Sequence, residues 1–539
     1  MKNVNPFVHK TSKHANKTLV FDFEGTLLRS TSLFSYFMLV SFEAGGILRS
    51  LILFLSYPLV WLVGEYQLGL KIMVFLTFFG LRKDSFRIGT SVLPKFFLED
   101  VGLEGFEAVM CCERKVASSK LPRIMVQGFL KDYLGVEAVV AREIKSCNGY
   151  FLGVFEKHKT TIPYDVKATS MDNNSIGIIG SHIEYIDQKL FPHYKKVCFM
   201  LTSNERRNWR ELPRKWYPKP LIFHDGRLAF KPTLISSFIM FMWLPLGILL
   251  SIFRITLGVS LPFNASASIL AFSGTRTTVS RPQTSTETEI NRKNMLYVCN
   301  HRTLLDPLYI SHTINKPLSA VTYSMSRFNE LISPIKTTRL TRDRHRDRKS
   351  MERMLNEGNL VVCPEGTTCR EPYLLRFSPL FAELTDDIVP VAVDVKGSMF
   401  YGTTASGHKC LDPFFHHLNP NPVYFVKILE RIPSSQTCHE GGKSGVEVAN
   451  FVQNEIGKSL GFCCTDLTRK DKYMTLADKV AQLMSLVYFF FKMEIVLVYG
   501  KVQPIQHDNI WYLASVHPTG QSNPSNNTMK HLMTSIYVE

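Results

Sequence analysis

His301 and Asp306 are the residues whose types and spacing most clearly suggest chemistry. They follow an apolar run that begins at Met295 and stops at Asn300, in the pattern H-x-x-x-x-D. A buried strand ending in a short polar turn would let the Asp306 carboxylate fold back onto the imidazole, hold one tautomer and stabilise the imidazolium. The other ring nitrogen could then accept a proton from a substrate hydroxyl. The spacing also fits an aspartate that begins a helix at Pro307, so both roles of Asp306 stay open.

Three further blocks follow, each an apolar strand that delivers polar residues. The second block carries Arg339 and Arg342, whose guanidinium groups suit phosphate oxygens, although a solvated basic face is the alternative. The third ends in Glu365, Gly366 and Thr367, where the glycine permits a tight turn whose amides can receive an anion or a hydroxyl. Glu365 could bind a polyol or only cap the turn. The fourth, 387–394, is expected to be a core strand.

The elements that position these blocks must belong to a chain with two or more domains, because it has 539 residues. Its formal net charge of +17 predicts an anionic partner, either a phosphorylated substrate or a membrane surface. No nucleic-acid-binding motif is present, so nucleic acid is not expected. The 11 cysteines show neither a disulfide framework nor metal-ligand spacing, which predicts reduced thiols facing the cytosol and no metal site. The basic N-terminus predicts no cleaved signal peptide.

An N-terminal motif resembles the first motif of haloacid-dehalogenase-type phosphatases, D-x-D-G-T. Residues 18–30 form an apolar strand that ends in Asp22, Glu24 and then Gly-Thr. The resemblance implies that Asp22 stands at the nucleophile position, and that Glu24 is one methylene too long for the general acid/base. Ser118 and Ser119 offer the second block of that family.

The last block of the same family should carry two acids that hold Mg²⁺. Here Ser181 and Tyr185 stand in those places, with Glu184 and Asp187 displaced by one and two positions. Because a hard cation needs several oxygen ligands, this site has lost most of its capacity for metal. We therefore expect 18–202 to keep a haloacid-dehalogenase-like fold with a degenerate, inactive phosphatase site at Asp22 and Glu24.

Apolar segments predict membrane association. Within the insert 47–81, the runs 47–64 and 68–81 suggest a hairpin sunk in the bilayer, or alternatively a buried helical cap. The basic, aromatic segment 203–232 suits the headgroup layer. Residues 233–273 then predict a membrane segment or a shallow hairpin kinked at Pro245. The remaining boundaries are a polar tail at 1–17, a solvated linker at 274–293, a catalytic domain at 294–473 and an extension without catalytic role at 474–539.

Taken in order, the four blocks resemble the motif set of the glycerolipid acyltransferases. The strings Val298–Ile310 and Val362–Pro379 are similar to those of the plant membrane-bound glycerol-3-phosphate acyltransferases, which also carry a phosphatase-like N-terminal region. The resemblance covers about residues 18–473. It implies two α/β domains, haloacid-dehalogenase-like and then glycerolipid-acyltransferase-like, with membrane-associated helical segments.

The resemblance also implies a reaction, the transfer of an acyl group from acyl-CoA to glycerol 3-phosphate. His301, oriented by Asp306, would be the base. Arg339 and Arg342 would hold the phosphate, and Glu365, Gly366 and Thr367 would position the glycerol. No metal and no cofactor beyond acyl-CoA as the acyl donor is expected.

The degraded phosphatase-like site implies lysophosphatidic acid as the product, for glycerolipids or cutin- and suberin-type extracellular lipids. One alternative is a bifunctional acyltransferase and phosphatase that releases monoacylglycerol. Another is a membrane scaffold without catalysis. The resemblance further implies the endoplasmic reticulum membrane with a cytosol-facing site, the mitochondrial membrane being the alternative. The sequence leaves open the acyl-chain length and the choice of glycerol position.

Overall fold

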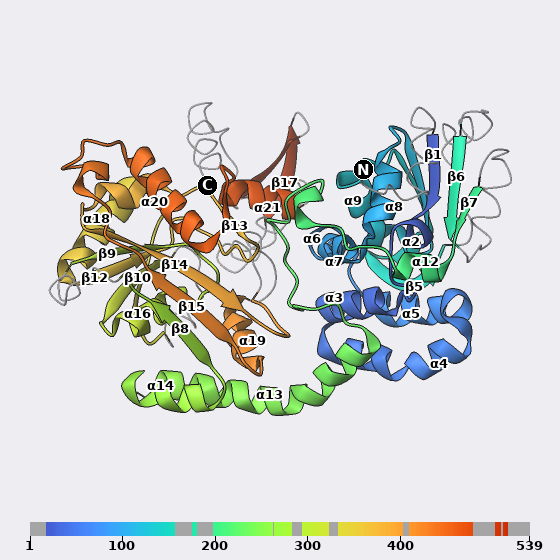
Figure 1. Ribbon diagram of the computed structural model, residues 1–539, viewed down its shortest axis with the longest axis horizontal. Helices are drawn as coiled ribbons and strands as arrows, with labels where there is room; N and C mark the ends of the chain where they lie inside the picture. Colours follow the sequence, from blue (N-terminus) through green and yellow to red (C-terminus); the bar gives the residue numbers. More distant parts are fainter. Residues whose placement is uncertain are drawn as a thin grey trace, which may run out of the picture. The chain divides into compact units, whose positions relative to one another are not determined.

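The computed structural model describes residues 18–156, 175–180, 198–261, 263–282, 294–322, 333–402, 409–477, 502–507 and 510–515 (Figure 1). One compact unit, Met1–Leu476, contains two α/β sheets. The other unit, Ala477–Glu539, contains β17 (Val502–His507) and β18 (Ile510–Ser515), which pair antiparallel where the sequence showed no clear pattern.

The N-terminal sheet is parallel, with the strand order β3-β2-β1-β6-β7. Its strands are β1 (Thr18–Asp22), β2 (Lys115–Ser119), β3 (Ala138–Ala141), β6 (Ser175–Gly180) and β7 (Cys198–Leu201). The helices around it include α2 (Phe23–Thr26), α6 (Ile88–Ser91), α7 (Leu93–Asp100), α8 (Leu103–Met110), α9 (Arg123–Asp132) and α12 (Ser203–Arg207). Asp22 and Ser118–Ser119 end neighbouring strands, and ligands bind at such carboxyl ends in parallel sheets.

The apolar insert forms α4 (Tyr57–Leu62), a π-helical turn η1 (Gly64–Leu68), α5 (Gly69–Phe78) and the second half of α3 (Phe34–Leu55). Later in the chain, β4 (Ile144–Cys147) and β5 (Tyr150–Phe155) form a hairpin that contacts α5. Figure 1 shows α3, α4 and α5 stacked together. The start of α3 is buried throughout, as a cap requires. Its second half and α4 expose large apolar side chains, including Leu48, Trp61 and Leu62, as a membrane-facing surface requires. The insert thus combines features of both sequence-based interpretations.

The strongest apolar run forms one long helix. Helix α13 (Leu234–Ser260) continues through Pro245, and α14 (Phe263–Phe272) follows it. One face of α13 packs on α19 (Asp412–Leu418): the Trp243 indole donates to the Leu418 carbonyl at 2.8 Å. The opposite face exposes Ile235, Met242 and Leu249. By length and composition alone, α3 and α13 are long and apolar enough to cross a membrane.

The C-terminal sheet has the order β11-β10-β12-β9-β14-β15-β8. Its strands are β8 (Arg276–Ser280), β9 (Leu296–Cys299), β10 (Leu318–Thr322), β11 (Lys336–Arg339), β12 (Asn359–Val362), β14 (Ile388–Lys396) and β15 (Val423–Ile428). Only the pairing of β14 with β15 is antiparallel within this described sheet. Helices α16 (Asp306–Ile314), α18 (Arg344–Glu357) and α20 (Gly445–Leu460) contact strands of this sheet. The same region contains α21 (Arg469–Ala477), the short pair β13 (Tyr373–Leu374) and β16 (Cys463–Cys464), and the 3₁₀ turns η4 (Pro379–Glu383), η5 (Lys409–Leu411) and η6 (Ser434–Gln436). A further 3₁₀ turn, η3 (Arg214–Trp216), lies in the segment before α13. The two sheets with their helices confirm the expected α/β class.

The linker expected over 274–293 is partly wrong, because residues 276–280 form the edge strand β8. Thr277 pairs with Tyr424 and Val279 with Val426. Threonine and valine favour extended backbone, and this pairing outweighs the polar composition that suggested a linker. Residues 283–293 lie outside the described part of the chain.

Candidate active site

His301 and Asp306 lie together at the carboxyl end of β9. The distance from His301 Nδ1 to Asp306 Oδ2 is 2.9 Å, and Asp306 is fully buried. Asp306 is also the first residue of α16, and it accepts from the amides of Arg302 at 2.6 Å and Thr303 at 2.9 Å. The orienting role that the spacing suggested is therefore present, whereas the capping role is not, because Leu305 is the N-cap residue of α16 and no side chain caps this helix. An ionised carboxylate held by several donors can orient the imidazole and stabilise its cation.

Tyr424 of β15 supplies another donor to the same carboxylate. Its hydroxyl donates to Asp306 Oδ1 at 2.7 Å, and its ring stacks on Tyr309 with centroids 3.7 Å apart. Tyr424 does not stand out in the sequence, because the antiparallel pairing of β15 with β14 that brings it here is not visible in residue spacing. A tyrosine in the mostly apolar strand β15 was the available signal.

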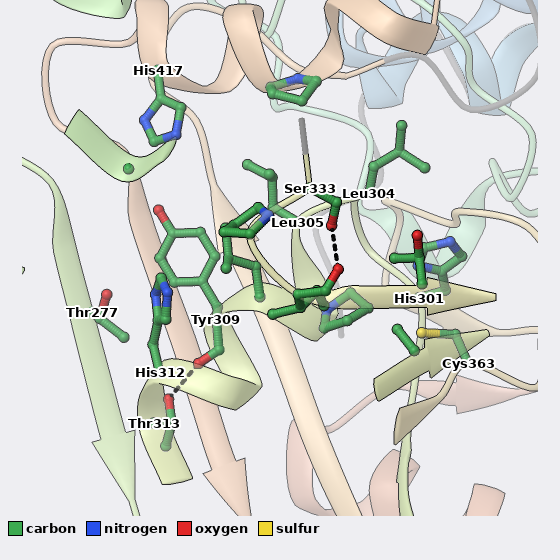
Figure 2. A pocket seen from close by; sticks show the side chains of 18 of the residues that line it. Thr277, His301, Leu304, Leu305, Tyr309, His312, Thr313, Ser333, Cys363 and His417 are labelled. Carbon is green, nitrogen blue, oxygen red and sulfur yellow. Dashed lines mark hydrogen bonds between the residues drawn. The ribbon is translucent and has the colours of Figure 1, made fainter. Parts of the chain in front are cut away.

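Cys363, which directly follows β12, lies next to His301 on the cavity wall (Figure 2). Its sulfur is 3.3 Å from that of Cys299 on the neighbouring strand. Burial lowers the pKa of His301, but Cys363 and Asp306 outweigh burial and raise it above its ordinary value. Hydrogen bonding from Cys299 and the charge of His301 lower the pKa of the Cys363 thiol. This thiol was not predicted as a site residue, although it immediately precedes the Pro-Glu-Gly-Thr turn.

Glu365 holds the third block against the first. One carboxylate oxygen accepts from the His301 amide at 2.7 Å and the other from the Leu375 amide at 3.0 Å. Because both oxygens bind backbone amides, Glu365 fixes the position of His301, and a glycerol ligand would have to share or displace these bonds. Gly366, with φ of 66°, makes the expected tight turn and lines the cavity together with Thr367.

Asn300 and Arg302 join the first block to the third and fourth. The Asn300 side chain makes two hydrogen bonds to the Val393 backbone, at 2.8 and 2.9 Å. Arg302 donates to the carbonyls of Cys369 and Glu371, both at 2.8 Å, and pairs with Asp394 at 2.9 Å. The fourth block supplies these backbone and side-chain partners to the first.

A cavity of about 820 Å³ connects His301 to α13 and α14. Near His301 its wall includes Leu304, Leu305 and Cys363, and at the far end Ile255 and Leu270. Figure 2 shows Tyr309 and His312 of α16 along the wall, on the side of Thr277 of β8. The volume falls in the range of small-molecule sites, and the largely apolar wall suits an apolar chain.

Arg339 and Arg342 are not among the residues that line this cavity. Both are exposed, although Ile335 and Thr337 of the same segment do line it. The cations on the described wall are Arg254, Arg281 and Lys409. The phosphate-binding role of Arg339 and Arg342 stays a prediction.

The phosphatase-like site is buried, and its acidic side chains interact with each other and with the end of β2. Burial and the adjacent Glu24 carboxylate raise the pKa of Asp22 well above its ordinary value. Glu24 Oε1 accepts from the Ser119 hydroxyl at 2.5 Å and from the amides of Lys120 and Leu121 at 3.0 and 3.1 Å. The predicted replacements Ser181 and Tyr185, with Glu184 and Asp187, lie outside the described residues. Within the described chain, no three His, Cys, Asp or Glu side chains are grouped to hold a metal.

Two family models match the chain. Residues 18–200 match the HAD-like domain of RAM2-like glycerol-3-phosphate acyltransferases, and residues 277–394 match the acyltransferase family. The second match begins within β8, in agreement with its place in the sheet.

Curated relatives match most of the chain. Probable glycerol-3-phosphate acyltransferase 2 of Arabidopsis thaliana is 50% identical over 482 residues, which cover 87% of this chain and 91% of that protein. Glycerol-3-phosphate acyltransferase RAM2 of Petunia hybrida is 42% identical over 462 residues, covering 84% and 96%. A solved lysophosphatidic acid acyltransferase from Thermotoga maritima covers 42% of this chain and 88% of its own at 16% identity, with a TM-score of 0.26, too weak a likeness to support any argument. The two plant relatives and both family models confirm the resemblance seen in the motifs: this chain is an acyltransferase and belongs to the plant glycerol-3-phosphate acyltransferase family.

Proposed function

We propose that this protein transfers an acyl group from acyl-CoA to glycerol 3-phosphate and releases lysophosphatidic acid. The observation that carries the proposal is the buried Asp306–His301 pair on the wall of a cavity that extends to α13 and α14. A base beside an apolar cavity suits a reaction between a hydroxyl and an acyl chain. The names of the plant relatives supply the acceptor, glycerol 3-phosphate.

His301 would take the proton of a glycerol hydroxyl, and the oxygen would attack the thioester carbonyl. Asp306 stabilises the imidazolium that forms, while the tetrahedral oxyanion needs preorganised donors. Collapse of this intermediate breaks the carbon–sulfur bond, and the CoA thiolate leaves with the proton from His301. No cofactor other than the acyl donor enters this scheme.

The acyl chain would occupy the cavity and approach it from the bilayer side of α13 and α14. The exposed apolar faces of α4 and α13 support contact with a membrane. We propose the endoplasmic reticulum membrane with a cytosol-facing site, and the mitochondrial membrane is the alternative. Fractionation of tagged protein against markers for both membranes distinguishes them.

Purified wild-type protein and His301→Ala, incubated with radiolabelled glycerol 3-phosphate and palmitoyl-CoA, test the reaction. Because general base catalysis contributes about a hundred- to ten-thousand-fold, we expect the variant to lose at least a hundredfold in rate. His439→Ala, at an exposed histidine, is the matched control and should keep full activity. The absence of labelled lysophosphatidic acid with wild-type protein across several acyl chain lengths would refute the proposal.

The product is expected to keep its phosphate, because burial and Glu24 raise the pKa of Asp22 and so reduce its nucleophilic carboxylate form, and because the end of β2 holds Glu24. Phosphate release from lysophosphatidic acid is measured for wild-type protein and Asp22→Asn. We expect background release from both. Release by wild type that Asp22→Asn abolishes would instead support the bifunctional alternative.

A further inference from the structure

We propose that Lys409 binds the phosphate of the acceptor substrate, over the turn formed by Gly366, Thr367 and Thr368. The inference rests on the proposed function, because that function supplies a small phosphomonoester as the acceptor. It assigns the cation that holds the phosphate to Lys409, which lies outside the four sequence blocks, beside the turn of the third block.

Of the cations that line the described wall of the cavity, Lys409 is best placed to bind the phosphate. The phosphate of glycerol 3-phosphate is only a few bonds from its reacting hydroxyl, so its partner must lie at the His301 end of the cavity. Arg254 is committed elsewhere, since its guanidinium donates to the carbonyls of His417 and Asn419, both at 2.7 Å. Arg281 donates to the Thr313 carbonyl near the C-terminus of α16, whereas Asp306 begins that helix.

The remaining wall cation, Lys409, shares the cavity with the turn that adjoins His301. Gly366, Thr367 and Thr368 line the same cavity, and the Cys369 amide donates to the His301 carbonyl at 2.8 Å. Gly366 lies in the left-handed region, which makes the turn tight, and its amide donates to the Cys363 carbonyl at 3.1 Å. The Lys409 ammonium and this turn, which adjoins His301, together suit the binding of a phosphate group.

Helix α21 adds positive charge behind the turn. The fully buried Lys472 ammonium donates to Thr367 Oγ1 at 3.0 Å and to the Thr368 carbonyl at 2.6 Å. Burial, aided by the charge of Lys409, lowers the pKa of Lys472 to about 7. An anion between the turn and Lys409 would relieve this repulsion.

The charge of Lys409 is available to a ligand. Its partner in the described part of the chain is the neutral hydroxyl of Tyr473, 3.5 Å away. Arg469 lies close by, 5.8 Å from the Tyr473 ring centroid, and approaches Gly366 with its side chain. Lys409, Arg469 and Lys472 therefore surround the turn with positive charge.

The test compares full-length Lys409→Met with wild type at saturating palmitoyl-CoA. Lys427→Met, at an exposed lysine of β15, is the matched control, and Arg339→Ala and Arg342→Ala test the sequence-based assignment. The readouts are KM and kcat for glycerol 3-phosphate and the inhibition constant of inorganic phosphate. Lys409→Met should raise KM and the inhibition constant at least tenfold, with kcat within a factor of about three. Lys409→Arg should recover much of the loss.

A KM unchanged in Lys409→Met, or a fall in kcat without a change in KM, would overturn the inference. So would a loss of phosphate inhibition confined to Arg339→Ala or Arg342→Ala. These outcomes require active wild-type protein. They therefore differ from failure of the proposed function, in which wild type itself acylates no glycerol 3-phosphate.

Discussion

At the scale of single residues, the orientation and the pKa of the His301 imidazole depend on side chains that come from several strands. Asp306 receives donors from its own turn and from Tyr424 of β15, while Cys363 after β12 adjoins the imidazole. Tyr424 and Cys363 should therefore change the behaviour of His301 without being bases themselves.

Tyr424→Phe removes one donor from a buried carboxylate while keeping the ring that stacks on Tyr309. A hydrogen bond to a charged group contributes roughly 1.5–3 kcal/mol, and 1.4 kcal/mol in a barrier is about tenfold in rate. We expect kcat to fall about tenfold while KM stays the same. Tyr309→Phe is the matched control, because its hydroxyl pairs with His416 and not with Asp306. Equal losses in the two variants would contradict a specific role for Tyr424.

Cys363→Ser should move the acidic limb of the activity profile to lower pH. The thiol raises the pKa of His301, so its removal lowers that pKa. His301 accepts a proton only when neutral, and a lower pKa keeps it neutral at lower pH. The profile of kcat/KM against pH measures this shift, with Cys147→Ser, at an exposed cysteine of the N-terminal region, as the control. A limb that stays in place or moves upward would argue against the contact.

His301 and Asp306 could be paired from the sequence because they belong to one short turn. Tyr424, Cys363 and the bonds of Glu365 could not, because parallel and antiparallel pairing brings distant segments together without leaving a local pattern. Glu365 illustrates the difference. Its type suggested a polyol ligand or a cap of the turn, and the folded chain uses both of its oxygens on backbone amides.

At the scale of elements, α13 connects the exposed apolar surface with the cavity. The sequence predicted an apolar segment there, but composition does not show which face packs on α19. The kink expected at Pro245 does not end the helix, which continues to Ser260. Strand β8 was missed for a related reason: its five residues are exposed, so burial leaves no apolar signal.

Gly258→Leu should shorten the acyl chains that the enzyme accepts. Gly258 lines the far part of the cavity with Ile255 and Val259, and no neighbouring atom lies within 4 Å of an added Cβ. The leucine side chain would therefore occupy cavity space, while the loss of a helical glycine favours the helix by about 1 kcal/mol. Competition between dodecanoyl-CoA and stearoyl-CoA should shift at least several-fold towards the shorter chain. Leu249→Phe, on the exposed face of α13, should leave the preference unchanged.

At the scale of the whole molecule, the segment 217–229 links the phosphatase-like region to the catalytic domain. The Arg370 guanidinium donates to the Gly226 carbonyl, and Arg227 pairs with Asp412 at 3.2 Å. Lys95 of α7 lies 4.0 Å from Glu371, which directly follows Arg370. The sequence predicted two domains separated by a basic segment suited to the headgroup layer, a membrane segment and a linker. It could not show that the basic segment packs against the third block, because the residues in contact lie far apart in the sequence.

Glu43 of α3 offers a test of whether the phosphatase-like region supports catalysis through structure. Its carboxylate accepts from the amides of Arg227 and Leu228 at 2.6 and 2.8 Å. In Glu43→Leu these amides lose their acceptor, at a cost of roughly 1–3 kcal/mol for each buried group. We expect a lower unfolding temperature and reduced acyl transfer, with a milder effect in Glu43→Gln, which keeps one acceptor oxygen. Scanning fluorimetry measures the unfolding temperature, and the glycerol 3-phosphate assay measures acyl transfer.

Asp22→Asn is the control, because it lies in the same region but away from the linking segment, and it should keep full acyl transfer. Full activity and unchanged stability in Glu43→Leu would show that the catalytic domain does not depend on this contact, whereas loss of acyl transfer in Asp22→Asn would place the dependence in the degraded site itself.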